Sequence, residues 1–476
     1  MTGNDLVALL PMLIPALAAV AVLLQVAVRR SASAALGITL LGLAGGLATL
    51  PAASSAGPRH VTALLAVDDY TLWYWGLLLA ATLAIVPMVY AYLSDSYEHP
   101  EEALVLVLVT ALGACILAAA IHFITVFLGI ELLSVSLFAL VGYLRKEEHG
   151  IEAGAKYLVL AAASSGFFLF GLALIYGATG EMSLTGLARA GQAAAASGLV
   201  QAGVALVLVG IGFKLGVVPF HLWAPDVYQG APAPVTALVA TVSKGGIIAV
   251  LARWVLDTDL EHDPTFLLAI AIIAGASMLL GNLLALTQNN VKRLLAYSSI
   301  AHFGYVLVAL VAGGKFAAGA VAFYVTAYIV TSVGSFGTIS LLSHRGYEAE
   351  DLAGYRGMFW RHPGTAAMFT AMLLSLAGVP LTAGFLGKLF VLRTGVGAAQ
   401  WTLVLLLAVG SVLGVFYYLR VVATMFQASD DEAIASPSPS AAGWLPVVFA
   451  TAFLFLLGIF PTPFMGLLAR AAAVLS

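Results

Sequence analysis

Charge is what this 476-residue chain has least of. Only 9% of its residues are Asp, Glu, Lys or Arg, whereas a soluble protein of this length carries roughly a quarter. The mean hydropathy is +1.04. The apolar residues stand in continuous runs of about 20, long enough for a helix to cross the ~30 Å hydrocarbon layer. An outer-membrane barrel is excluded because its strands alternate apolar and polar residues. The sequence therefore predicts an all-α polytopic membrane protein.

Cysteine is almost absent too. The single Cys115 excludes an internal disulfide, an iron–sulfur site and a tetrahedral thiolate zinc site. GIGFKLG (210–216) follows no strand, so its glycines are not a dinucleotide-binding loop, and no phosphate-binding loop is present. We therefore expect no cofactor and no metal in this chain. No basic block suggests nucleic acid.

Hydropathy predicts fourteen membrane-spanning helices. The first run follows Met-Thr-Gly-Asn-Asp, which carries no positive charge, and it continues beyond Val20, so we expect a retained helix and not a signal peptide. Only Ile121-His122-Phe123 separates the fourth span from the fifth. The predicted ranges are 5–28, 33–56, 70–94, 102–121, 123–144, 154–177, 197–222, 233–256, 265–287, 293–313, 316–343, 364–392, 402–427 and 441–472.

Basic residues in or near the loops predict the orientation. With fourteen spans, ten of them fall on one side: Arg29, Arg30, Arg145, Lys146, Lys292, Arg293, Arg345, Arg356, Arg361 and Arg420. Six fall on the other: Arg59, Arg189, Arg253, Lys315, Arg393 and Arg470. Because cytoplasmic loops are enriched in Lys and Arg, both termini are expected on the outer side.

Two stretches echo each other, KLGVVPF at 214–220 and LAGVPLTAGFLGK at 376–388. Each places Gly, Val and Pro in mid-span beside a lysine. Proline removes a helical hydrogen bond, and the freed carbonyls need partners at membrane depth. Interrupted spans at matching places in two halves indicate an internal repeat with its site at the midplane. The alternative is a chance echo in a chain rich in Gly, Ala and Val.

Four lysines remain inside predicted spans, Lys156, Lys214, Lys244 and Lys388. A lysine at a helix centre costs roughly 2.5–3.5 kcal/mol on insertion scales, so packing alone does not explain it. Burial in general lowers the pKa of a lysine, which then exchanges protons near neutral pH. We therefore predict proton-transfer sites, with structural ion pairs as the alternative. For Lys156 both readings stay open, because Glu152 stands four residues before it.

Other titratable and polar groups accompany these lysines. Glu131 is the most deeply placed carboxylate and must pair or be protonated. His302 is a candidate on a polar helix face, although a lone histidine is more often a packing residue. His221, near a membrane exit, is either a protonation switch or a hydrogen bonder at a helix end. Two polar faces at helical spacing could line a hydrated path: Ser298, His302 and Tyr305, and Tyr324, Tyr328, Thr331 and Ser335.

The motifs FKLGVVPFHLWAPDVYQGAPAPVTALVATVSK and GNLLALTQNNVKRLLAYSSIAHFGYVLVAL resemble the antiporter-like subunits of respiratory complex I. The loop PDVYQGAP, the span ELLSVSLFALVGY and the lysine in GVPLTAGFLGK are most similar to those of the N-type (chain 2) subunits. The match runs from about residue 100 to 425. The chain stops just after its last span, without the long lateral helix of the L-type subunits.

This resemblance implies a fold and a set of roles. It implies N-terminal helices over 1–100, two inverted five-helix repeats over 101–262 and 263–428, and a final loop and helix over 429–476. Glu131 would pair with Lys214, and Lys244, His302 and the exit residue Lys388 would continue a hydrated path. Two residues depart from the family pattern: Leu381 replaces a frequent second proline, and Ala233 replaces a common threonine.

The resemblance also implies an activity and partners. We expect a proton-translocating subunit of NADH:quinone oxidoreductase, a translocase, in a bacterial inner (plasma) membrane. NADH, FMN, iron–sulfur clusters and quinone would be bound by partner subunits. The partners would be other membrane-arm subunits, including the antiporter-like subunit M and the small membrane subunits. The alternatives are a subunit of a cation/proton secondary antiporter, and a membrane-arm subunit that no longer pumps. The retained titratable groups argue against the last.

Overall fold

The computed structural model describes residues 2–95, 99–145, 147–189, 197–256, 258–314, 316–344, 347–428 and 441–474. The N-terminal part contains α1 (Gly3–Val28), α2 (Ala32–Ala48), α3 (Leu50–Ser55), β1 (Arg59–Val61), β2 (Leu65–Val67) and α4 (Asp69–Asp95). Then come α5 (Pro100–Ala119), α6 (Phe123–Val141), α7 (Glu148–Thr179), α8 (Leu184–Arg189), α10 (Gly198–Leu215), α11 (Trp223–Gly230), α12 (Ala233–Leu238), the π-helical turn Val239–Ser243 and α13 (Lys244–Leu256).

The second half of the chain is also helical. After a 3₁₀ turn (Asp259–His262) it contains α14 (Pro264–Leu286), α15 (Val291–Ala312) and α16 (Ala317–Leu342). A second 3₁₀ turn (Leu352–Tyr355) leads to α17 (Met358–Arg361), α18 (Pro363–Ala377), α19 (Ala383–Gly397), α20 (Trp401–Phe426), α21 (Ala441–Ile459) and α22 (Thr462–Ala472).

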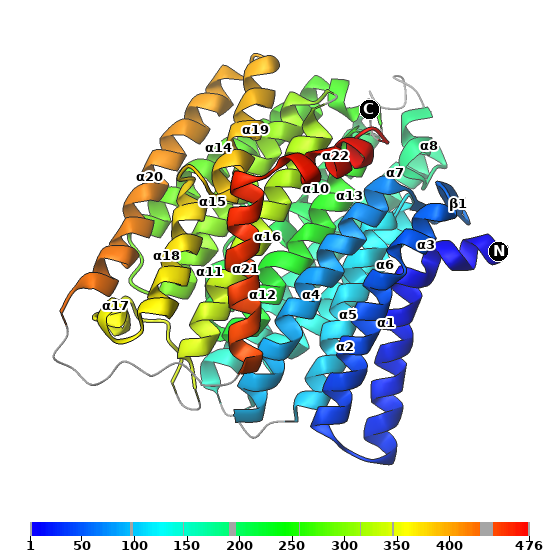
Figure 1. Ribbon diagram of the computed structural model, residues 1–476. Coiled ribbons are helices and arrows are strands. Elements are labelled where there is room, and N and C mark those ends of the chain that lie inside the picture. Colours follow the sequence, from blue (N-terminus) through cyan, green and yellow to red (C-terminus); the bar gives the residue numbers. More distant parts are fainter. Residues whose placement is uncertain are drawn as a thin grey trace.

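These helices confirm the predicted multi-pass membrane fold. Within the described ranges twelve helices are long and apolar enough to cross a membrane, or thirteen if the bent pair α21–α22 is one span. The predicted span 364–392 is two helices of 15 residues, α18 and α19, on either side of a break. The predicted span 441–472 bends by 83° after Ile459, because Pro461 cannot continue the hydrogen-bond ladder of α21. Figure 1 shows α22 lying across the ends of neighbouring helices.

A short hairpin departs from the all-α expectation. Strand β1 pairs antiparallel with β2, with Arg59 opposite Val67 and Val61 opposite Leu65. Each strand has three residues, which is too short for an alternating pattern to be recognised in the sequence. The hairpin leads directly into α4.

Burial separates central spans from peripheral ones. The whole apolar window of the span Ala233–Leu256 is buried, as is 94% of the windows of α15 and α16. In contrast, 33% of the windows of α7 and α20 is buried. Figure 1 shows α1 and α2 at one edge of the bundle and α20 at the other. Three of the most polar predicted segments therefore lie inside protein, where their side chains avoid lipid.

Candidate functional site

Two helix breaks have the same backbone geometry. Helix α10 ends at Leu215, Gly216 is left-handed with φ 67°, and the Val217 N–H donates to the Gly212 carbonyl at 3.1 Å. Helix α18 ends in the same way, with Gly378 at φ 87° and the Val379 N–H on the Leu374 carbonyl at 3.0 Å. This is the Schellman ending, which favours glycine because it has no Cβ. The echo between the two sequence stretches is therefore a structural parallel.

Each break leaves carbonyls that other side chains satisfy. At the first break, the Trp223 indole N–H donates to the Phe213 carbonyl at 2.8 Å. At the second, the Lys388 ammonium reaches back to the Ala377 carbonyl at 2.8 Å. A carbonyl at membrane depth needs such a partner. Lys388 therefore lies at the break itself, although it is on α19.

Lys214 occupies the last turn of α10. Its side chain is buried, and the ammonium donates to the Ser134 hydroxyl of α6 at 2.5 Å. The Tyr157 ring centroid lies 5.3 Å from the ammonium, and that ring stacks on Trp223 at 4.8 Å. Aromatic faces stabilise a desolvated cation through the ring quadrupole. The charge of Lys214 is thus held by a hydroxyl and aromatic rings.

Glu131 does not contact Lys214 directly, although the resemblance implies a pair. It lies on α6 one turn before Ser134, is half-buried, and accepts a hydrogen bond from Ser165 of α7. No ion pair joins Glu131 to Lys214 within the described ranges. A serine binds each of the two charged groups instead, Ser165 for Glu131 and Ser134 for Lys214.

Lys244 begins α13 immediately after the π-helical turn and has no exposed surface. Its ammonium donates to the Ser299 hydroxyl of α15 at 2.7 Å and lies 4.8 Å from the Phe303 ring centroid. Ser299 also accepts the Tyr328 hydroxyl of α16 at 2.8 Å. Lys244 is therefore connected to the polar face of α16 through one serine.

His302 joins the two predicted polar faces. Its Nδ1 lies 2.7 Å from the Tyr324 hydroxyl of α16, and its Nε2 lies 3.2 Å from the Tyr418 hydroxyl of α20. Tyr418 also bonds Ser298, the first residue of the other predicted face. Both ring nitrogens thus have hydroxyl partners, through which a proton can be exchanged.

Lys388 is buried beside the same residues. Its ammonium lies 5.4 Å from the Tyr305 ring centroid. The Tyr305 hydroxyl accepts the Asn282 amide at 2.9 Å, and Asn282 in turn accepts the Tyr417 hydroxyl at 3.0 Å. We call Lys214, Lys244, His302 and Lys388 the central row.

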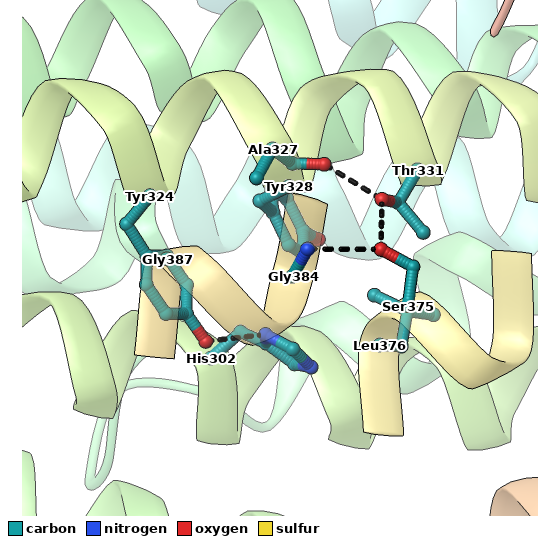
Figure 2. Close-up of a pocket in the computed structure, with 9 residues that line it drawn as sticks. All are labelled: His302, Tyr324, Ala327, Tyr328, Thr331, Ser375, Leu376, Gly384 and Gly387. Atoms are coloured by element: carbon teal, nitrogen blue, oxygen red, sulfur yellow. Dashed lines mark hydrogen bonds between the residues drawn. The ribbon is translucent and has the colours of Figure 1, made fainter. Parts of the chain in front are cut away.

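A small cavity lies between α15, α16 and the second break (Figure 2). Its walls are His302, Tyr324, Ala327, Tyr328, Thr331, Ser375, Leu376, Gly384 and Gly387. The cavity has a volume of about 10 Å³, which is the space that about one water molecule needs. Thr331 and Ser375 share a hydrogen bond of 3.1 Å across it. A water there would connect Tyr328, the neighbour of Ser299, with His302.

A family model described as NADH:quinone oxidoreductase/Mrp antiporter, TM, matches residues 120–414. A curated relative, NADH-quinone oxidoreductase subunit N from Ectopseudomonas mendocina (strain ymp), is 44% identical over 484 residues, covering 99% of this chain and 98% of the relative. The chain belongs to the subunit N family of NADH-quinone oxidoreductase.

Solved structures share the fold of this subunit N family member. A chain of respiratory complex I from Thermus thermophilus with bound aureothin has TM-score 0.83 and 34% identity, covering 97% of this chain and 99% of that one. A chain of the archaeal membrane-bound sulfane sulfur reductase has TM-score 0.86 and 25% identity, covering 99% of this chain and 98% of that one. A chain of the Mrp complex from Dietzia sp. DQ12-45-1b has TM-score 0.87 and 21% identity, covering 100% of this chain and 98% of that one. At this identity the likeness shows the fold alone. Similar TM-scores across different complexes mean that the fold does not decide the function.

Lys156 and His221 form no hydrogen bond with a residue of the central row within the described ranges. Lys156 pairs with Glu152 at 2.8 Å and with Asp226 at 3.0 Å, and 44% of its side chain is exposed. This geometry favours the ion-pair alternative for Lys156. His221 is buried in the turn between α10 and α11, where its Nδ1 has no hydrogen-bond partner within the described ranges. Its role stays a prediction.

Two cations that were grouped with the loops are buried in this subunit N family member. Arg253, at the end of α13, donates to both carboxylate oxygens of Asp68 at 2.8 and 2.9 Å. Lys292, at the start of α15, is 1% exposed and pairs with Glu348 at 2.8 Å. Both lie at span ends, as expected. Their carboxylate partners are what permit burial.

Sequence reasoning did not identify the neutral partners of the lysines and of His302. Ser134, Ser299 and Tyr418 were unassigned, because each contacts its partner across a different span. A serine one turn after Glu131 was the only local hint. No group of three or more His, Cys, Asp and Glu residues that could hold a metal ion occurs in the ranges that the structure covers.

Proposed function

We propose that this chain moves protons across the membrane as subunit N of an NADH:quinone oxidoreductase. The protons pass along the central row. Electron transfer takes place in partner subunits, which bind NADH, FMN, iron–sulfur clusters and quinone. The chain supplies the proton path and no redox centre.

One observation carries this proposal. Lys214, Lys244 and Lys388 are 2%, 0% and 6% exposed, and in the described part of the chain none of them forms an ion pair. Each ammonium instead has a neutral acceptor, a serine hydroxyl or a backbone carbonyl. A lysine without a carboxylate can lose its proton without leaving a buried anion unpaired. Three such groups support repeated protonation and deprotonation.

The spacing of partners supports electrostatic coupling along the row. Glu131 acts on Lys214 without contacting it. A proton gained or lost at one lysine changes the potential at the next, because charges interact strongly in a low dielectric. The hydroxyl groups around Ser299 and His302, together with a water in the cavity, are the groups through which protons pass between Lys244 and Lys388.

The same reading gives partners and location. As a subunit N, the chain assembles with other membrane-arm subunits, including the antiporter-like subunit M and the small membrane subunits. The membrane is a bacterial plasma membrane, with both termini on the outer side. The ten basic residues near loops of the opposite side support this orientation. The cation/proton antiporter reading is less supported, because the 44% identical relative is a quinone oxidoreductase subunit.

Lys214→Arg tests the proposal in vesicles that carry the assembled complex. Arginine keeps the positive charge but is not deprotonated in proteins, whereas buried lysine titrates readily. We expect a proton translocation rate at least about ten-fold lower, since loss of one proton-transfer group costs 10²–10⁴ in other systems. The readouts are a pH-sensitive dye, quinone reduction and the amount of complex.

The control exchanges the same side chains at an exposed position, Arg29→Lys, and should leave all three readouts unchanged. Near wild-type translocation by assembled Lys214→Arg would leave Lys214 a structural cation. Copurification identifies the partners. An isolated folded chain that exchanges cations for protons without any redox substrate would support the antiporter alternative.

A further inference from the structure

The span that carries Lys244 begins at an unusual sequence, Ala231-Pro232-Ala233-Pro234. Pro232 and Pro234 have no backbone N–H. Of the three residues at the start of α12, Ala233 is therefore the one that can donate a backbone hydrogen bond. That N–H donates to the Glu348 carboxylate at 3.1 Å. Glu348 lies in the loop after α16, 115 residues further along the chain than Ala233.

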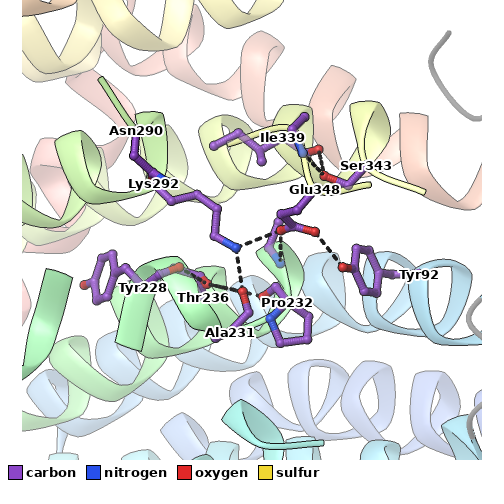
Figure 3. Close-up of polar contacts among 12 residues, drawn as sticks. Tyr92, Tyr228, Ala231, Pro232, Thr236, Asn290, Lys292, Ile339, Ser343 and Glu348 are labelled. Carbon is purple, nitrogen blue, oxygen red and sulfur yellow. Dashed lines mark hydrogen bonds and ion pairs between the residues drawn. The ribbon is translucent and has the colours of Figure 1, made fainter. Parts of the chain in front are cut away.

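The same carboxylate binds two other helices (Figure 3). The Lys292 ammonium of α15 donates to its Oε1 at 2.8 Å, and the Tyr92 hydroxyl of α4 donates to its Oε2 at 2.5 Å. Lys292 also donates to the Ala231 carbonyl at 2.6 Å. The carboxylate and the ammonium thus bind the start of α12 to the start of α15. Glu348 thus contacts α4, α12 and α15.

The helices joined by Glu348 are the two that meet at Lys244. Lys292 and Ser299 are seven residues apart on α15, which places them on one face about two turns, or ~10 Å, apart. Ser299 is the hydrogen-bond partner of Lys244 at 2.7 Å. The Glu348 bridge between α12 and α15 and the Lys244–Ser299 contact therefore join the same two spans.

A change of helix type lies between these two contacts, on the span that contains α12 and α13. The π-helical turn Val239–Ser243 separates α12 from Lys244. Such turns have a wider hydrogen-bond spacing than the α-helix and occur often at functional sites. The residues of the turn are buried, and the Thr241 hydroxyl donates to the Ala237 carbonyl of α12 at 2.6 Å, so the turn connects Lys244 to α12.

We propose that Glu348 is a positioning residue for proton transfer at Lys244. By binding Ala233, Lys292 and Tyr92 together, it sets the register of α12 against α15 and so the contact between Lys244 and Ser299. This inference rests on the proposed function. It adds a residue outside the central row, in a loop, on which the geometry of the row depends.

The test uses the assembled complex in vesicles, with complex amount, quinone reduction and proton translocation as readouts. Glu348→Gln removes the charge that Lys292 and Ala233 share, and we expect translocation about three- to ten-fold lower at an unchanged amount of complex. Glu350→Gln is the matched control. It makes the same change two residues away, and the described residues offer its side chain no hydrogen bond or ion pair.

A double-mutant cycle distinguishes positioning from general support. If Glu348 acts through Lys244 and Ser299, Glu348→Gln added to Ser299→Ala lowers translocation no further than the more severe single change. Losses that multiply in the double variant would overturn the proposal, as would equal translocation by Glu348→Gln and Glu350→Gln. Glu348→Asp, which keeps the charge, should recover more than half of the lost rate.

Two further variants cover the remaining outcomes. If Glu348→Gln does not assemble, Tyr92→Phe removes one donor and keeps the carboxylate, and a translocation rate of Tyr92→Phe equal to that of the wild type would overturn the proposal. Lys244→Met separates the two levels of the argument. If Lys244→Met pumps normally, the proposed function itself fails, whereas a Lys244→Met defect with normal Glu348→Gln overturns the positioning role alone.

Discussion

Two kinds of buried cation contact occur along the span Ala233–Leu256. Beside its start Lys292 of α15 faces the Glu348 carboxylate, and at its end Arg253 faces the Asp68 carboxylate. In its middle, Lys244 faces a serine hydroxyl and aromatic rings. All of these cations are buried to a similar degree. The two kinds of contact differ in the group that faces the cation, and not in how deeply the cation is buried.

The partner decides what a buried cation can do. An ion pair that loses one charge leaves the other uncompensated, at a cost of several kcal/mol, so its protonation state is fixed. A lysine beside a hydroxyl can be charged or neutral with the hydroxyl acting as acceptor or donor. The ends of the span therefore hold it in place, while its centre can change charge. The same contrast separates Lys214 and Lys388 from the paired cations.

Lys244→Met gives the largest expected effect on translocation. Methionine keeps the length and loses the charge. Among the described residues the hydrogen bond that it loses is the one to Ser299, which keeps Tyr328. We expect a proton translocation rate about 10²-fold lower or more, with complex amount unchanged. The measurement is dye quenching in vesicles at a matched amount of complex. A strong loss of assembled complex would show that Lys244 is structural, like the cations at the span ends.

Arg253→Met should produce the opposite pattern. It leaves Asp68 buried without its cation, which destabilises a protein by about 3–5 kcal/mol. We expect much less assembled complex and a lower thermal midpoint, but translocation per remaining complex close to wild type. Arg253→Met combined with Asp68→Asn should recover part of the stability, because no anion is left unpaired. Normal stability with poor translocation would place Arg253 on the proton path.

The sequence was informative where the signal is local. Hydropathy gave the spans, and Gly-Val-Pro next to Lys214 and before Lys388 gave both breaks, because a break depends on residues within one turn. The bend after Ile459 was missed although Pro461 marks it, since apolar residues continue into α22. The hairpin β1–β2 was missed because its strands are short.

The candidate site was predictable only in part. The lysines and His302 stood out because charged groups are costly in apolar spans. Their partners did not, because Ser134, Ser299 and Glu348 come from other parts of the chain and a serine has no cost that marks it. The predicted roles of these residues still require the measurements described above.

Leu381 shows how a departure from a family pattern can be physically consistent. It stands where the family often has a second proline, and its φ is +74°. Proline is fixed near −65°, so it cannot adopt this backbone. The loop between α18 and α19 therefore follows a path that excludes the proline, while Gly378 and Lys388 keep the break.

Lys156→Gln gives the smallest expected effect and settles the alternatives for this residue. Lys156 is exposed over 44% of its side chain and pairs with Glu152 and Asp226, and exposed pairs contribute little. Asp226 keeps Arg293 at 2.7 Å. We expect translocation at neutral pH to fall by less than about two-fold. A loss as large as that of Lys244→Met would add Lys156 to the central row.

The pH dependence of the same variant tests the ion pair directly. Burial raises the pKa of Asp226, but the hydrogen bonds and charges of Arg293 and Lys156 outweigh it and hold that pKa below the ordinary value. The stability contributed by Asp226 is thus present above its unfolded pKa of about 3.9 and is lost as the pH falls through the lower folded value. Lys156→Gln removes one of the two cations, so the pKa of Asp226 rises and the complex should dissociate at a higher pH on acidification. Lys156→Arg, which keeps the charge, should dissociate at the wild-type pH. If Lys156→Gln and Lys156→Arg show the same acid midpoint, Asp226 is held by Arg293 alone and the pair with Lys156 has no measurable role.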